Sequence, residues 1–135
     1  MILTGACHCG AVVARLETAD PTAVQVRACQ CDFCRRHGAK TVSDPNGRLT
    51  LTFAEGAVSR YRFGLKITDF LICRACGDFV AAVMDGLAVL NVVGVDMAPL
   101  ASRDPEPMHY DGEDEDARVA RRAARWMPVT LEIPA

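Results

Sequence analysis

The chain has 135 residues, of which 50% are hydrophobic and 24% charged, a composition typical of one globular domain spanning residues 1–135. Its formal net charge of -2 and its pI near 5.9 exclude the strongly basic surface of a general nucleic-acid binder. Residues 1–10 lack the basic and apolar regions of a signal peptide. The longest apolar run, residues 86–95, is about half of the ~20 residues that a membrane helix needs. We therefore expect a cytoplasmic protein without a membrane segment.

Short strands separated by turn residues are predicted along most of the chain. Residues 11–17 and 23–28 are rich in alanine and β-branched residues, and residues 49–53 alternate apolar and polar side chains, as a half-buried strand does. The segments that predict further strands are 58–63, 67–72, 79–84, 87–95 and 129–133. Because 79–84 and 87–95 are almost entirely apolar, we place them in the centre of the sheet.

Residues 112–127 predict a helix instead. The segment begins acidic and ends basic, which complements the helix dipole, and helical spacing places Val119, Ala123 and Trp126 on one face. Pro128 ends it. Its arginines suggest phosphate binding, but the acidic run at 113–116 favours a solvated, salt-bridged helix. The predicted fold class is therefore mainly β, with one short helix near the C-terminus.

All seven cysteines fall into three short-spaced groups, which are Cys7 with Cys9, then Cys29, Cys31 and Cys34, then Cys73 with Cys76. In a reducing compartment such density indicates metal or redox chemistry rather than structural disulfides. Zinc takes four protein ligands in structural sites, and three plus a water in catalytic sites. The simplest partition therefore places the two dyads on one ion and the triad on a second.

A glycine follows each dyad, Gly10 after Cys9 and Gly77 after Cys76. In a metal knuckle the chain turns tightly after the second cysteine, so that backbone N–H groups point at the thiolate sulfurs. Glycine tolerates the positive φ that this turn needs. The glycines therefore support a closed four-cysteine site.

The triad leaves one position of its ion to water, a substrate or a more distant residue. His37 follows Cys34 closely enough to reach the ion, although a surface histidine beside two arginines is the more common situation. His8 lies between two ligands and points away from them. His109 comes from a late segment and is placed to line a pocket from across the fold.

Other uses of these cysteines account for less of the sequence. Iron–sulfur clusters are held by four cysteines, whereas the triad offers three. A dithiol redox site at Cys73 and Cys76 leaves the other five cysteines without a role. Zinc at both sites, two ions per chain, accounts for all seven.

The motifs TGACHCGAV, CQCDFCRRHGA and CRACG resemble, in order and spacing, those of the glutathione-dependent formaldehyde-activating enzyme family, which shares its domain with centromere protein V. The resemblance runs from about Thr4 to Trp126. It implies an Mss4-like β-tent of stacked antiparallel sheets with a short C-terminal helix. It also implies two zinc sites: a structural one on Cys7, Cys9, Cys73 and Cys76, and a catalytic one on Cys29, Cys31 and Cys34.

The activity that the resemblance implies is a carbon–sulfur lyase reaction, run in the direction that joins formaldehyde to glutathione. His109 and Trp126 are similar to the family's C-terminal histidine and tryptophan. Two departures concern the last dyad: Phe70-Leu71-Ile72 precedes it where many members have Arg-x-Phe, and Asp78 follows its glycine where many have Ser or Thr. The metal framework survives these changes, but substrate identity does not follow from it.

We predict an enzyme that joins or cleaves a glutathione-like thiol and a small aldehyde at the open zinc. Three thiolates weaken the Lewis acidity of the ion, which favours thiol binding over carbonyl activation. A proton donor for the new alkoxide is still required, and the candidates are His109, then Asp32 and His37. The alternatives are a zinc-stabilised binding module without catalysis and a glutathione-dependent enzyme on a different substrate.

Overall fold

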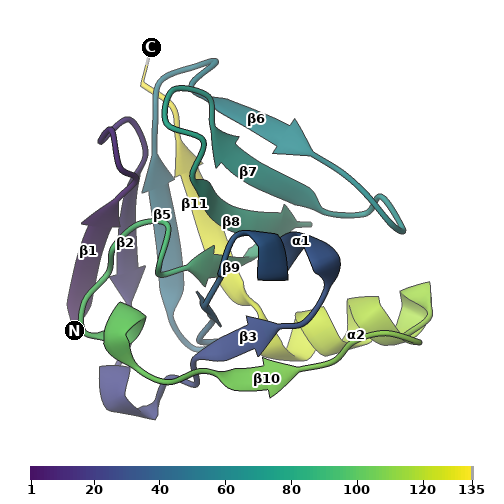
Figure 1. Ribbon diagram of the computed structural model, residues 1–135. Coiled ribbons are helices and arrows are strands. Elements are labelled where there is room, and N and C mark those ends of the chain that lie inside the picture. The colour runs from purple at the N-terminus through teal and green to yellow at the C-terminus, as the bar shows by residue number, and fades with distance from the viewer. Residues whose placement is uncertain (135) are drawn as a thin grey trace.

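The computed structural model describes residues 1–134, which form eleven strands, two α-helices and two short 3-10 helices (Figure 1). The strands are β1 (Ile2–Ala6), β2 (Val13–Glu17), β3 (Arg27–Cys29), β4 (Thr41–Val42), β5 (Arg48–Thr52), β6 (Val58–Tyr61), β7 (Asp69–Cys73), β8 (Phe79–Met84), β9 (Leu87–Asn91), β10 (Glu106–Met108) and β11 (Met127–Glu132). The helices are η1 (Pro21–Ala23), α1 (Asp32–Arg36), η2 (Leu100–Ser102) and α2 (Glu115–Arg125).

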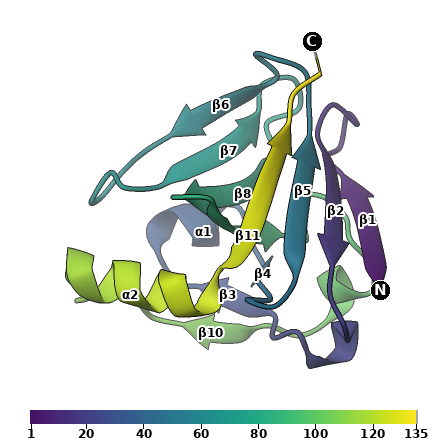
Figure 2. The ribbon, with the colours of Figure 1, turned by 180° about the vertical axis from the view of Figure 1, so that it is seen from behind.

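Two groups of strands meet along β11, as the opposite views of Figures 1 and 2 show. One group runs in the order β1-β2-β5-β11, and the other includes β6-β7-β8-β9 with β4, β3 and β10 continuing from β9. The start of β11, at Met127 and Pro128, pairs with β9, whereas residues 129–132 pair with β5. One strand therefore joins both groups. Most pairs are antiparallel as predicted, but β11 with β5 and β10 with β3 are parallel.

Alternating side chains of the strands build two hydrophobic clusters. The larger cluster lies between the two groups of strands and includes the fully buried Leu16, Leu51 and Leu90. The smaller cluster is aromatic, and Phe79 and Trp126 are buried in it. It adjoins α1 and the start of β11, so the chain has a second packed region beside its main core.

The mainly β class and the short helix near the C-terminus are confirmed. β8 and β9 lie inside the sheet with mostly buried side chains, also as predicted. The strand predicted at 23–28 is largely wrong, because Pro21 begins a 3-10 turn capped by the side chain of Asp20, and the strand starts only at Arg27. The strands β1, β4 and β10 were not predicted.

The helix α2 faces the protein with a different side from the predicted one. Asp114 caps it, its carboxylate accepting from the N–H of Ala117 at 2.7 Å. Val119 is 38% exposed and Ala123 is exposed, whereas Arg122 is only 8% exposed. The prediction of a solvated helix is therefore wrong for its inner face, which carries an arginine.

Among the described residues, no helix has both the length and the apolar character needed to cross a membrane.

Candidate metal centres and the cavity beside them

Two hairpins bring four of the seven cysteines together. Cys7 and Cys9 lie in the turn between β1 and β2, Cys73 ends β7, and Cys76 lies in the turn between β7 and β8. Their four sulfur atoms all lie within 4.8 Å of one another. This cluster, the tetrad, therefore connects a hairpin of one strand group to a hairpin of the other.

The tetrad fits a tetrahedral metal ion. The Sγ atoms of Cys7 and Cys9 are 3.8 Å apart, and those of Cys9 and Cys73 are 3.6 Å apart. Zn–S bonds of about 2.3 Å in a tetrahedron place sulfurs about 3.8 Å apart, whereas a disulfide needs about 2.05 Å. All seven cysteines are free thiols. The spacing is that of ligands around an ion, which bears out the predicted grouping of the two dyads.

Backbone geometry supports the tetrad as the sequence predicts. Gly10 and Gly77 have φ values of +82° and +81°, which L side chains rarely adopt. The N–H of Val12 donates to the sulfur of Cys7 at 3.3 Å. Burial raises the pKa of the Cys73 thiol, but the backbone N–H groups of Cys76 and Ala75 outweigh it and lower that pKa to about 7. The turn that follows β7 thus favours a thiolate at Cys73.

Asp78, one of the departures noted in the sequence, ties the two turns together. Its Oδ2 accepts a hydrogen bond from the backbone N–H of His8 at 2.7 Å, and its own carbonyl accepts from the N–H of Cys73 at 2.9 Å. Asp78 thus closes its own turn and contacts the turn that carries Cys7 and Cys9. The aspartate that departs from the family pattern is therefore compatible with the metal framework, because it tethers the two turns.

The remaining three cysteines form a separate cluster, the triad. Cys29 ends β3, and Cys31 and Cys34 flank the first turn of α1, where the sulfur of Cys31 accepts from the N–H of Cys34 at 3.3 Å. The three sulfurs lie within 4.8 Å of one another. Cys34 is buried, while Cys29 and Cys31 are half-buried. A six-residue segment thus supplies three soft ligands that could hold a metal ion.

The triad favours one thiolate within the group. Hydrogen bonds from the thiols of Cys29 and Cys34 hold the pKa of Cys31 far below its usual value. The same contacts, together with burial, raise the pKa of Cys34. Three sulfurs placed this closely therefore share negative charge, and a soft cation at their centre would balance it.

A cavity of about 120 Å³ opens beside the triad. All three triad cysteines line it, and none of the tetrad cysteines does. Its apolar wall comes from the smaller hydrophobic cluster and includes Phe70, Phe79 and Trp126. The two cysteine clusters therefore differ in their surroundings, because the triad lines this cavity and the tetrad does not.

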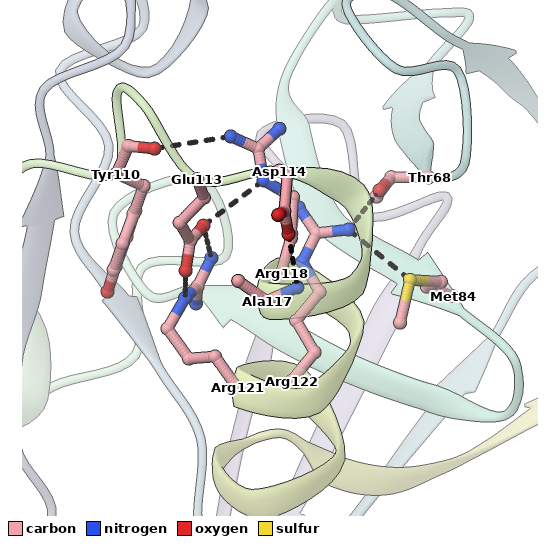
Figure 3. A network of polar contacts seen from close by, with 9 residues as sticks. All are labelled: Thr68, Met84, Tyr110, Glu113, Asp114, Ala117, Arg118, Arg121 and Arg122. Atoms are coloured by element: carbon pink, nitrogen blue, oxygen red, sulfur yellow. Dashed lines mark hydrogen bonds and ion pairs between the residues drawn. The ribbon is translucent and has the colours of Figure 1, made fainter.

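The charged part of the lining is mostly cationic: Arg118, Arg121 and Arg122 come from α2 and Arg27 from β3, beside one acidic residue, Asp111. Figure 3 shows Glu113 between Arg118 and Arg121, with N–O distances of 3.2 Å and 2.7 Å. The side chain of Arg122 points away from Glu113. Its terminal nitrogen donates to Thr68 and lies 3.4 Å from the sulfur of Met84. Burial, with the neighbouring arginines, lowers the pKa of Arg122 to about 10, still well above neutrality.

The structure places the three predicted proton donors outside the cavity lining. Asp32 is exposed at the start of α1 and pairs with Arg35 at 3.1 Å and Arg36 at 3.2 Å. His37 ends α1 on the surface, its ring 4.5 Å from that of Phe33 between centroids. His109 is exposed directly after β10. The residue that follows it, Tyr110, does line the cavity.

Sequence reasoning missed the arginines that line the cavity. Arg27 is 7% exposed and lies on β3 two residues before the triad, and Arg122 comes from α2. The sequence did contain a pattern that indicates Arg122, because it lies four residues before Trp126 and such pairs meet on one side of a helix. In the structure its guanidinium carbon lies 4.4 Å from the centre of the Trp126 ring. The pattern was obscured because Val119 and Ala123 offered an apolar face of the same period.

Comparisons with known proteins agree with this geometry. Residues 2–110 match the model of the family described as glutathione-dependent formaldehyde-activating enzyme. The chain is also similar to the crystal structure of a protein from Rhodobacter sphaeroides, at 26% sequence identity and a TM-score of 0.63. That similarity covers 78% of this chain and 99% of the other. The family match ends before α2 and β11 begin.

Proposed function

The chain belongs to the glutathione-dependent formaldehyde-activating enzyme family, and from this premise we propose that it joins or cleaves a thiol and a small aldehyde at the triad. We further propose two zinc ions per chain, a structural one on the tetrad and a reactive one on Cys29, Cys31 and Cys34. The observation that carries this proposal is the cavity lined by all three triad cysteines. A site that is purely structural has no need of such access.

The reaction balances without a redox partner. The thiol sulfur forms a bond to the carbonyl carbon, the carbonyl π electrons move to oxygen, and oxygen takes up one proton as the thiol gives one up. Zinc, when bound, supplies a charge that stabilises the substrate's thiolate. The chain's own residues provide the rest: Phe70, Phe79 and Trp126 line the cavity and exclude water from the reacting carbon.

The alkoxide oxygen needs a proton, for which His109 remains the first candidate, with Asp32 and His37 behind it. Tyr110 is added to them because it lies on the cavity wall. If His109 or Tyr110 supplies the proton, His109→Ala or Tyr110→Phe should slow the reaction about 100-fold or more, within the range of general acid catalysis. The variant that leaves the rate unchanged identifies a bystander.

Thiol–aldehyde addition also proceeds without an enzyme, so the test must measure acceleration of the exchange. ¹³C exchange spectroscopy on labelled formaldehyde with glutathione gives the rate of interconversion between free aldehyde and adduct. The zinc-loaded chain should accelerate this interconversion, and a folded Cys31→Ala variant should not. If the wild-type chain holds both metals and leaves the rate unchanged, it is a zinc-stabilised binding module or acts on another substrate.

Larger aldehydes and glutathione adducts, used in the same assay, separate those two outcomes. A rate increase with any of them retains thiol-dependent catalysis and changes only the substrate. No increase with any of them leaves the binding module.

A further inference from the structure

Two buried arginines line the cavity without an acidic partner. Arg27 is 7% exposed and Arg122 is 8% exposed. Within residues 1–134, a terminal nitrogen of Arg27 donates to Ser43, a terminal nitrogen of Arg122 donates to Thr68, and no ion pair reaches either guanidinium. The Nε atom of each is buried and has no hydrogen-bond partner. Both side chains therefore carry their charge into the cavity lining without a direct ion pair.

Two buried arginines without ion pairs are unfavourable for the chain when no ligand is bound. A buried charge without a paired opposite charge is strongly destabilising, so buried arginines are normally paired. The other arginines of the wall do not help, because Arg118 and Arg121 already share Glu113. Three thiolates around a divalent cation carry one net negative charge, so the triad with its ion would offset only one of these positive charges. Asp111, an exposed residue of the same lining, supplies one more negative charge, and the four arginines still leave an excess of positive charge.

The position of Arg122 is fixed rather than adaptable. Its guanidinium lies 4.4 Å from the ring centre of Trp126. Thr68 and Met84 hold its terminal nitrogen, as Figure 3 shows. Trp126 is 5% exposed. A guanidinium held in one orientation loses little entropy when it binds a planar oxyanion, and two donors in one plane match a carboxylate.

The size and lining of the cavity limit what can reach these arginines. At about 120 Å³ the cavity is smaller than the roughly 300–1,000 Å³ of sites that enclose a drug-sized ligand, so it accepts a compact group or one end of a longer molecule. Its remaining wall is mostly apolar, with Phe63, Phe70 and Phe79. A small carboxylate on a short apolar body fits both walls.

We propose that Arg27 and Arg122 form a specificity site for a carboxylate of the substrate whose reacting end lies at the triad. The placement of the reacting end rests on the proposed function, whereas recognition of the carboxylate can be tested without it. Arg122 lies beyond the segment that matches the family model, so half of this site comes from a part of the chain that the match does not cover.

The test uses two matched pairs of probes on the zinc-loaded full chain. 3-Mercaptopropanoate and 3-mercaptopropanamide share size and thiol but differ in charge, and propanoate with propanamide repeats the comparison without a thiol. The ¹H–¹⁵N signals of the arginine Nε groups report on the guanidinium environment, and the titration gives the affinity. We expect the acid of each pair to bind about 10- to 100-fold more tightly than its amide and to shift the Arg27 and Arg122 signals.

Variants assign that preference to residues. Arg122→Gln should lower the affinity for 3-mercaptopropanoate to that for the amide while leaving the amide's own affinity unchanged. Arg125→Gln is the matched control, because Arg125 lies on the same helix, carries the same charge and is exposed. Arg27→Gln repeats the test outside the helix, which keeps the proposal testable if Arg122→Gln does not fold.

Equal affinity for acid and amide in the wild-type chain would overturn the proposal, since the arginines would then only balance the charge of the metal centre. An equal loss of affinity in Arg125→Gln would overturn it as well, because the effect would be one of general charge. If thiols fail to perturb the metal site but propanoate still shifts both arginine signals, the carboxylate site stands and the thiol–aldehyde function fails.

Discussion

The two cysteine clusters use the same chemical group in opposite ways. The tetrad draws its ligands from two hairpins separated by residues 10–72, and two of them, Cys7 and Cys73, belong to the main hydrophobic core. The triad draws its ligands from six consecutive residues, and Cys34 belongs to the smaller aromatic cluster. One cluster joins distant parts of the fold, and the other is local.

The cavity divides them in the same way, because the triad lines it and the tetrad does not. The tetrad is complete in itself, with four sulfurs at tetrahedral spacing and a carboxylate tether between its turns. The triad is one ligand short of a closed site and faces a cavity with an apolar and a cationic wall. Four ligands from distant parts of the chain suit a metal ion that stabilises the fold. Three ligands from one short segment suit a metal ion that binds a substrate.

The largest expected effect is the loss of a tetrad ligand. Structural zinc contributes apparent binding energies of about 10–16 kcal/mol, and a domain of this size is stable by only about 5–15 kcal/mol. Cys76→Ala should therefore be unfolded or insoluble. Cys31→Ala, its control, removes a local ligand and should remain folded. Circular dichroism and thermal melts of the two variants measure the difference, and equal unfolding of both would mean that both sites are structural.

A smaller effect is expected from a chelator. Three protein ligands hold an ion less tightly than four, and the triad faces a cavity that a competitor can enter. Titration with a chelator should remove one metal while the melting temperature changes little, and the second metal only as the chain unfolds. Metal content and melting temperature are followed on the same samples. Loss of both metals in a single step, accompanied by unfolding, would erase the distinction between the clusters.

The smallest effect concerns the charged wall beside the triad. Arg121, followed by Arg118, lowers the pKa of Glu113 below its usual value near 4.5. The ion pairs therefore contribute their stability above that pH, and the contribution is lost as the pH falls through the lower, folded-state pKa. Because the pairs are partly exposed, Glu113→Gln should cost less than about 1 kcal/mol at pH 7.

The difference in melting temperature between wild type and Glu113→Gln isolates this effect, since metal loss in acid affects both chains. The difference should be largest near neutral pH and should shrink below pH 4.5. A difference that stays constant down to pH 3 would show that the glutamate acts through packing rather than charge.

Much of the metal framework could be predicted from the sequence because its signals are local. Cysteine spacing and the glycines after each dyad define tight turns, and the structure places Gly10 and Gly77 at positive φ. The apolar segments that became β8 and β9 were also predictable, since a strand buried on both faces must be apolar throughout.

The charged half of the cavity could not be predicted in the same way. Periodicity placed Val119 and Ala123 on an inner face, whereas the fold turns Arg122 inward. That choice depends on Trp126, which follows the helix and is buried, and on Thr68, which lies directly before β7 and accepts a hydrogen bond from Arg122. Partners so distant in sequence leave no local pattern.

The measurement that most directly tests the division between the clusters is ¹¹³Cd NMR of the cadmium-substituted chain during a titration with glutathione. Cadmium signals report the number of sulfur ligands, so a closed site and an open site give separate resonances. We expect two signals, of which only one shifts with glutathione, and that one is absent in Cys31→Ala. A single signal, or two signals that glutathione leaves unmoved, would contradict an open metal site at Cys29, Cys31 and Cys34.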